Sequence, residues 1–150
     1  MRTRGEALVK PLCIRPGLKV LDLACNDPST ALTAARLGAQ VHALDIASGA
    51  DLAALEDRSF DLVLSFFGAM YAPRPFEVAR DLVRLTRPGG RIVMGNWMPE
   101  GPAPGPALAG PLSWGIEDNV VERFRAAGVA PQDIACVRME RYLRVKVRVR

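Results

Sequence analysis

Apolar and polar residues follow one another along the chain in a pattern that predicts alternating strands and helices. Runs of strand length, rich in Val, Leu, Ile and Phe, span residues 19–23, 40–45, 60–66 and 91–97. The run over 60–66 is almost continuously apolar, which is typical of a strand buried on both faces of a parallel sheet. Helical spacing of apolar residues between these runs favours a mainly parallel sheet with helices on both faces.

Proline and glycine mark the expected ends of the helices. We expect helices at residues 6–13, 28–37, 76–86 and 117–127. Loops are expected at residues 46–58, 67–75 and 99–111, the first with one helical turn at most. The breaker Arg87-Pro88-Gly89-Gly90 should end the third helix before the next strand begins. Residues 133–138 and 141–150 are expected to form two terminal strands, as an antiparallel pair.

The second expected helix has a recognisable start. Asp27 can cap it, and Pro28 suits its first position, where a missing N–H costs little. Leu32, with Ala31 and Ala35, is expected to form its buried face.

Composition bounds the class of protein. A chain of 150 residues with 49% hydrophobic and 24% charged residues fits one globular domain, so residues 1–150 are treated as a single domain. We find no apolar run of the about 18 residues that a membrane span needs, and no signal-peptide apolar region at the N-terminus. The three cysteines lack metal-ligand spacing and there is one histidine, so no metal site is expected. This cysteine usage favours a cytoplasmic location.

Basic residues are concentrated at the C-terminal end. In residues 144–150, Arg and Lys alternate strictly with Val, which predicts a strand with one buried and one solvated face. Such charges discourage edge-to-edge aggregation. A nucleic-acid-binding strand is the alternative, but no aromatic residues are interleaved with these charges, so a nucleic-acid partner is disfavoured.

One segment suggests a cofactor site. An apolar strand ending near Asp22 leads through a tight turn into a helix, and the next strand ends in Asp45. A β-α-β unit whose second strand ends in a carboxylate is the arrangement that holds an adenosine-bearing cofactor.

Taken in order, several segments resemble the class I S-adenosylmethionine-dependent methyltransferases, in particular those that act on small molecules. Residues 20–25 match the first half of the family's cofactor motif, and Asp45 falls at its ribose-binding acid. Residues 59–65 match its fourth strand, and residues 87–91 match the turn before its fifth strand. The resemblance implies a three-layer, Rossmann-like α/β methyltransferase sheet, mostly parallel, with an antiparallel C-terminal strand or hairpin. It also implies S-adenosylmethionine as the cofactor and a small-molecule methyl acceptor.

The resemblance also assigns candidate cofactor-binding residues, which follow the ends of the first, second and fourth family strands. They are Asp22, Ala24, Cys25, Asn26, Asp45, Ile46, Asp51, Leu52, Ser65 and Phe66. Catalytic residues stay unknown, because methyl transfer mainly needs an aligned methyl group and the exclusion of water. Tyr71, Glu100 and Asp27 are candidates for a base where the acceptor must lose a proton.

Two features depart from the family pattern. The glycine-rich turn is replaced by Ala24-Cys25-Asn26-Asp27-Pro28, and Pro28 removes a backbone donor from the start of the helix. Only five residues separate Asp45 from Asp51, so the family's usual third strand is expected to be missing. The strand over 40–45 would then be an edge, and a homodimer that covers this edge is expected.

Two functions remain open from the sequence. One is a methyltransferase acting on a small molecule. The other is a degenerate family member that does not catalyse and serves as an interaction or structural unit. Binding of the cofactor would separate them, because fold alone does not decide function.

Overall fold

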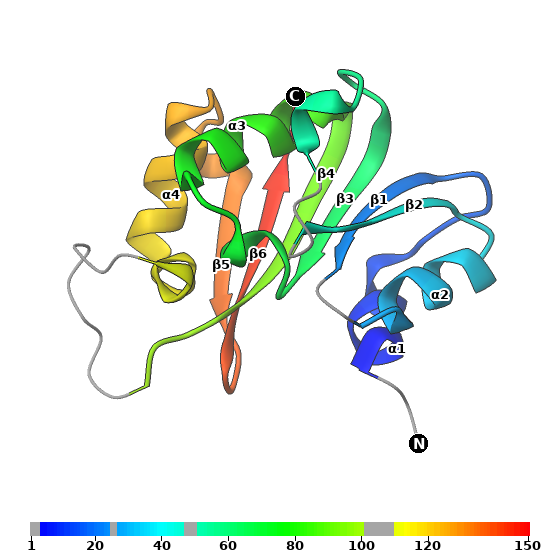
Figure 1. Cartoon of the computed structure of the whole chain (residues 1–150), viewed down its shortest axis with the longest axis horizontal. Helices are drawn as coiled ribbons and strands as arrows, with labels where there is room; N and C mark the ends of the chain where they lie inside the picture. The colour runs from blue at the N-terminus through cyan, green and yellow to red at the C-terminus, as the bar shows by residue number, and fades with distance from the viewer. Residues whose placement is uncertain (1–3, 25–26, 47–50, 101–109) are drawn as a thin grey trace.

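The computed structural model describes residues 4–24, 27–46, 51–100 and 110–150, and in these residues one mixed sheet is flanked by helices (Figure 1). The strands of this sheet are β1 (Lys19–Ala24), β2 (Gln40–Asp45), β3 (Phe60–Phe66), β4 (Thr86–Trp97), β5 (Ile134–Arg138) and β6 (Tyr142–Arg148). The α-helices are α1 (Arg4–Val9), α2 (Ser29–Arg36), α3 (Pro75–Leu85) and α4 (Glu117–Ala126). Short 3₁₀ turns are η1 (Lys10–Leu12), η3 (Leu52–Ala54), η4 (Ala69–Tyr71), η5 (Pro111–Gly115) and η6 (Pro131–Asp133).

The sheet has the strand order β2-β1-β3-β4-β6-β5. Strands β1 to β4 pair in parallel, whereas β6 is antiparallel to both β4 and β5. This confirms the mostly parallel α/β fold with an antiparallel C-terminal hairpin. The chain passes from β1 outward to β2 and then returns to the other side of β1 to form β3. That reversal is where open α/β sheets bind ligands, beyond the carboxyl ends of their strands.

Helices cover the two faces of the sheet as two packed pairs (Figure 1). Helices α1 and α2 pack together beside β1 and β2, and α3 and α4 pack together beside β3, β4 and β5. Side chains alternate between faces along a strand. Arg91 of β4 donates to the carbonyl of Leu12, next to α1, whereas Ile92 points to the opposite face and pairs with Val147.

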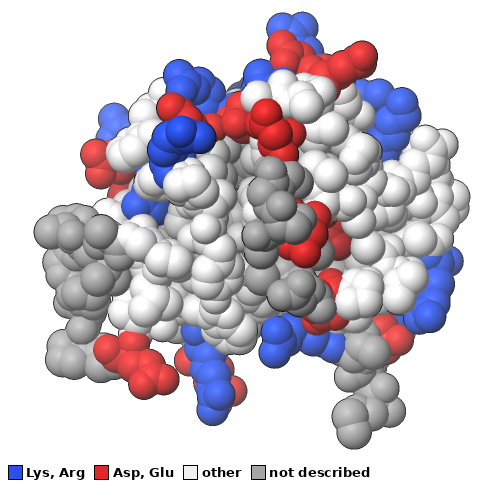
Figure 2. All heavy atoms as spheres, viewed as in Figure 1, with Lys and Arg blue, Asp and Glu red and all other residues white. Residues whose placement is uncertain are grey.

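The core lies where the central strands are covered on both sides. The run over β3 is buried along almost its whole length, as its continuous apolar sequence predicted. In β6, Leu143, Val145 and Val147 are buried and alternate with the charged residues, which confirms the predicted two-faced strand. On the face drawn in Figure 2, Lys and Arg are interspersed with Asp and Glu over the described residues.

The breaker before the fourth apolar run does not end strand pairing, so the expected start of that strand was wrong. β4 begins at Thr86, and its pairing with β3 shifts register between Phe60 and Leu62, which accommodates the extra residues as a bulge. Gly89 has a φ of +86°, which glycine adopts without strain. The bulge is held by backbone bonds to Val149, which accepts from the Gly89 N–H and donates to the Gly90 carbonyl.

The buried face of α2 also differs from the expectation. Thr30, Thr33 and Ala34 are buried, whereas Leu32 is 50% exposed and Ala35 is exposed. The reason is that the N-terminal end of α2 packs closely against α1, and only small side chains fit such a contact. The N–H of Gly5 donates to Ser29 Oγ over 3.0 Å, and a Cβ on Gly5 would lie 2.3 Å from the Ser29 carbonyl carbon.

Strand β2 forms one edge of the sheet. In the described part of the chain β2 pairs with β1 alone, as the expected loss of the family's third strand requires. The segment that replaces the missing elements contains the turn η3, in agreement with the expected loop. No helix in the described ranges combines the length and the apolar character that crossing a membrane requires.

Candidate functional site

The predicted site residues follow the carboxyl ends of the parallel strands. Ala24 and Asp45 are register partners at the ends of β1 and β2, and Asp22 pairs with Leu64 across β1 and β3. Phe66 and Trp97 end β3 and β4. The fold therefore brings the ends of four neighbouring strands to one edge of the sheet, as the strand order requires.

Asp22 is a buried carboxyl group at this edge. Asp22 is only 1% exposed, and its Oδ2 accepts no hydrogen bond from the described residues. Burial raises the pKa of Asp22 to about 7, and the negative charge of Asp27 adds to this shift. An unsatisfied buried oxygen of this kind is costly and suits a positively charged or donating group of a ligand.

The turn after β1 is partly described. Asp27 Oδ1 accepts the N–H of Ser29 over 2.9 Å, but the N-cap of α2 is Pro28 and the helix begins at Ser29, one residue later than predicted. This bond lowers the pKa of Asp27, and the charge of Arg4 contributes to the same shift. An ionised carboxylate already engaged with the backbone is a weak base. Cys25 and Asn26 lie outside the described residues.

A cavity of about 420 Å³ adjoins the ends of β2 and η4. It is lined by Ile46, Asp51, Leu52, Ala72, Pro73, Arg74, Glu77, Val78 and Asp81. Three of the predicted cofactor residues thus meet at one hollow, and its volume lies in the range of small-molecule sites. Asp51 also holds the local turn, since its Oδ1 accepts the N–H of Ala53 over 2.9 Å.

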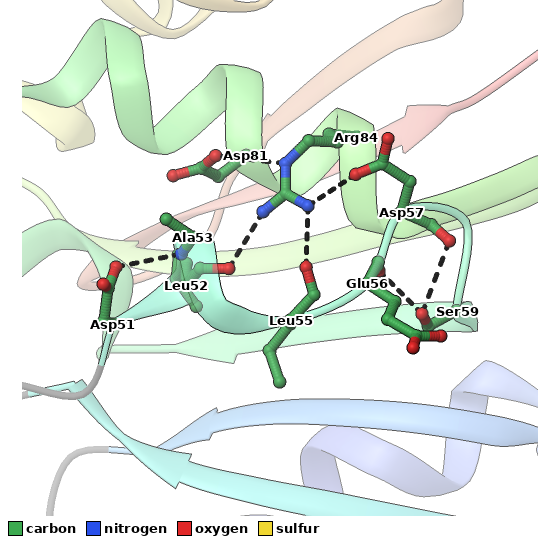
Figure 3. Close-up of polar contacts among 9 residues, drawn as sticks. All are labelled: Asp51, Leu52, Ala53, Leu55, Glu56, Asp57, Ser59, Asp81 and Arg84. Atoms are coloured by element: carbon green, nitrogen blue, oxygen red, sulfur yellow. Dashed lines mark hydrogen bonds and ion pairs between the residues drawn. The ribbon is translucent and has the colours of Figure 1, made fainter.

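Arg84 of α3 fixes the segment that leads from this cavity to β3 (Figure 3). Its Nη2 donates to the Leu52 carbonyl over 2.9 Å, and its Nη1 donates to the Leu55 carbonyl over 2.8 Å. The same guanidinium contacts the carboxylates of Asp57 at 2.7 Å and Asp81 at 3.3 Å. These contacts, with that of Asp57 the strongest, raise the pKa of Arg84. One arginine therefore holds both ends of η3 against α3.

The end of β3 holds the remaining predicted residues. Ser65 is fully buried, and its Oγ accepts the N–H of Ala69 over 2.8 Å, which stabilises the turn into η4. Phe66 is buried beside it. Phe67 follows with a φ of +61°, a left-handed conformation that is rare for a bulky residue and that recurs at functional sites.

An aromatic cluster of Phe67, Trp97 and Tyr142 borders the site, and of these three residues sequence reasoning did not single out Tyr142. The rings of Phe67 and Trp97 stack with centroids 3.9 Å apart, and Tyr142 meets Phe67 edge-on at 5.5 Å. The guanidinium of Arg4 lies 5.5 Å from the Phe67 centroid and 5.6 Å from the Trp97 centroid. Neither the aromatic contacts nor the Arg84 contacts have a local sequence signal, because each joins segments distant along the chain.

The three candidate bases differ in their exposure and contacts. Tyr71 in η4 is 48% exposed and Glu100 is exposed, whereas Asp27 accepts the Ser29 N–H at the start of α2. In the part of the chain that the structure describes, no group of three or more His, Cys, Asp or Glu residues could hold a metal ion.

Residues 47–94 match the family model described as a methyltransferase domain. An uncharacterised protein of Mycobacterium tuberculosis is 33% identical in an alignment that covers 81% of this chain and 57% of that protein. The chain therefore spans little more than half the length of this relative.

Solved structures share the whole fold at low identity. A SAM dependent methyltransferase from Aquifex aeolicus superposes with a TM-score of 0.72 at 16% identity, covering 96% of this chain and 88% of the other. The 1,6-didemethyltoxoflavin-N1-methyltransferase of Burkholderia thailandensis, solved with its substrate and S-adenosylhomocysteine, gives a TM-score of 0.66 at 19% identity. That match covers 97% of this chain and 76% of the other.

Replacing Arg84 should loosen the segment beside the cavity. Arg84→Met removes the donors to two carbonyls and two carboxylates, and we expect a loss of about 1–3 kcal/mol in the free energy of unfolding. Hydrogen exchange should accelerate in residues 52–57. The control is Arg80→Met on the exposed side of the same helix, which should change neither quantity. Equal effects of the two variants would contradict the role given to Arg84.

The buried Asp22 predicts a pH dependence of stability. Its folded-state pKa of about 7 exceeds the ordinary aspartate pKa of 3.8, so the folded protein retains a proton that the unfolded chain releases. Stability should therefore fall as pH rises from about 4 to 7 and then level off. Asp22→Asn should flatten this slope and stabilise the ligand-free protein at pH 8 by up to about 4 kcal/mol. Urea unfolding at pH 5 and pH 8 tests this, and an unchanged slope in the variant would refute it.

Proposed function

We propose that this chain, which belongs to the class I S-adenosylmethionine-dependent methyltransferase family, binds S-adenosylmethionine at the strand ends and methylates a small molecule. The observation that carries the proposal is the cavity lined by Ile46, Asp51 and Leu52, just after the carboxyl end of β2. Its lining combines apolar side chains with charged ones, and a nucleoside has an apolar base and polar hydroxyls to match both.

Each part of the cofactor has a matching group on the chain. Asp45, at the end of β2, would accept the ribose hydroxyls, and Ile46 and Leu52 would pack against adenine. The orphaned Oδ2 of Asp22 would meet the cationic methionine portion, whose charge favours the ionised carboxylate. The residues present therefore fit the cofactor chemically.

When bound, S-adenosylmethionine supplies an electrophilic methyl group on its sulfonium. The chain has to align that group with the acceptor and remove water. Both the alignment and the exclusion of water would depend on the rings of Phe66, Phe67 and Trp97, which are buried or half-buried at the ends of β3 and β4. Arg84 acts indirectly, by fixing the segment that carries Leu52.

The second candidate function is that of a methyltransferase-like unit without catalysis. Pro28 favours it, because it stands at the start of α2 and offers no N–H where glycine-rich turns usually present donors. Asp27 also places a negative charge there, close to where a carboxylate of the cofactor would lie.

Calorimetry with S-adenosylhomocysteine separates the two functions. We expect a dissociation constant in the micromolar range, and a loss of affinity of about tenfold or more in Asp45→Asn. Asp118→Asn, on the exposed surface of α4, is the matched control and should bind like the parent chain. No heat and no thermal shift at millimolar ligand would support the non-catalytic alternative.

We also propose that two copies associate through β2. Its sequence, Gln-Val-His-Ala-Leu-Asp, has no Lys or Pro that would discourage pairing. The N–H of Gln40 donates to Leu18 of the preceding segment, so by alternation the N–H of Ala43 faces away from β1. Leu32 and Leu37 on α2 are 50% and 37% exposed and would be covered by the second copy.

Ala43→Pro tests this association. Proline removes an outward donor and obstructs an added strand, whereas an edge strand tolerates it. Light scattering should show a dimer for the parent chain and for the Ala43→Ser control, and a monomer for Ala43→Pro. A parent chain that is monodisperse and monomeric at high concentration would contradict the proposal.

A further inference from the structure

Two arginines, Arg4 and Arg144, lie on the same face of the sheet as the aromatic cluster at the ends of β3 and β4. Register places Trp97 opposite Tyr142 and Gly95 opposite Arg144, so all four residues lie on one face of the sheet. Phe67 stacks on Trp97, and Arg4 of α1 covers both rings. We call Phe67, Trp97, Tyr142, Arg4 and Arg144 the aromatic–arginine surface.

The flat part of this surface is built by close backbone contacts. A Cβ on Gly95 would lie 3.0 Å from a Phe66 ring carbon and 3.4 Å from a Tyr142 ring carbon, so glycine lets the rings converge. Trp97 and Tyr142 are half-buried, which leaves part of the ring surface accessible. A planar aromatic ligand suits such a surface, because rings pack well against rings.

The two arginines of the surface, Arg4 and Arg144, favour a negatively charged ligand. Among the described residues, the Arg4 side chain makes no hydrogen bond or ion pair. It contacts the rings of Phe67 and Trp97, and its charge lowers the pKa of Asp27. The Nε of Arg144 is buried and has no hydrogen-bond partner in the described part of the chain. Guanidinium groups with unused donors favour a carboxylate, which accepts charge-assisted bonds. A cationic ligand would be repelled by both arginines.

We propose that this surface binds the methyl acceptor, and that the acceptor is an aromatic acid whose carboxylate meets Arg4 and Arg144. The proposal rests on the proposed function, because it places the acceptor beside the cofactor crevice. In the transfer, the nucleophilic group of the acceptor, which is a hydroxyl in the probe used below, loses its proton to solvent and forms a bond to the methyl carbon. The S–C bond of the sulfonium breaks at the same time and leaves a neutral thioether.

The test compares three related probes by calorimetry on the full chain saturated with S-adenosylhomocysteine. They are 3,4-dihydroxybenzoate, its neutral amide and the cationic dopamine. We expect the acid to bind about tenfold or more tightly than the other two. Arg4→Gln and Arg144→Gln should each remove most of that preference, and Trp97→Leu should weaken the acid and the amide alike. Arg125→Gln on the exposed side of α4 is the control and should change nothing.

The outcomes separate the two proposals. Failure of S-adenosylhomocysteine to bind overturns the proposed function itself. Normal binding of that ligand, with equal affinity for acid, amide and dopamine, overturns only the acceptor class. If Arg4→Gln weakens S-adenosylhomocysteine but leaves the preference for the acid intact, Arg4 holds the cofactor carboxylate and its place in the acceptor surface is wrong. Far-UV circular dichroism and thermal unfolding establish that each variant folds.

Discussion

The guanidinium of Arg84 is the contact on which the shortened architecture depends. Between β2 and β3 the chain has too few residues for the family's usual helix and strand, and the regular element described in this connection is the short turn η3. Arg84 compensates from α3 by donating to the carbonyls of Leu52 and Leu55 and by pairing with Asp57 and Asp81. Carbonyl groups that would otherwise need water or a strand are thereby satisfied. Leu52 and Asp81, which both line the cavity beside β2, are thereby joined through one side chain.

At the end of β1, unfavourable electrostatic interactions involve the carboxyl groups of Asp22 and Asp27. Asp22 is buried, its Oδ2 has no hydrogen-bond partner among the described residues, and the charge of Asp27 raises its pKa further. In a low-dielectric setting such a group destabilises the ligand-free protein and favours a ligand that brings positive charge. The negative side chains Asp22 and Asp27 lie at and after the end of β1, whereas Arg4 lies over the Trp97 ring at the end of β4 and Arg144 lies opposite Gly95.

Much of the fold could be predicted because its signals are local. The continuous apolar run of β3, the alternation in β6 and the short connection after Asp45 fixed the strands and the missing edge. Two local predictions were wrong because tertiary contacts overrode them. The Pro-Gly-Gly segment stays within β4 because Val149 bonds to it, and α2 turns Leu32 outward because α1 requires small neighbours.

The candidate site was less predictable. Motif resemblance pointed to Ile46, Asp51 and Leu52, which the fold gathers around one cavity. It gave no indication of Arg84, Arg4, Tyr142 or Arg144, since their roles arise from segments that meet only after folding. Nothing in a linear pattern distinguishes these arginines from the other basic residues of the chain.

Glycine determines how the aromatic–arginine surface is supported. Gly5 abuts the backbone of Ser29, and Gly115 approaches the Trp97 carbonyl so closely that a Cβ would lie 2.2 Å from its oxygen. Main-chain contacts, rather than the rings themselves, thus hold α1 and the end of β4 in place. The backbone under the rings is therefore held in place by glycine contacts that do not involve the ring atoms of Phe67, Trp97 or Tyr142.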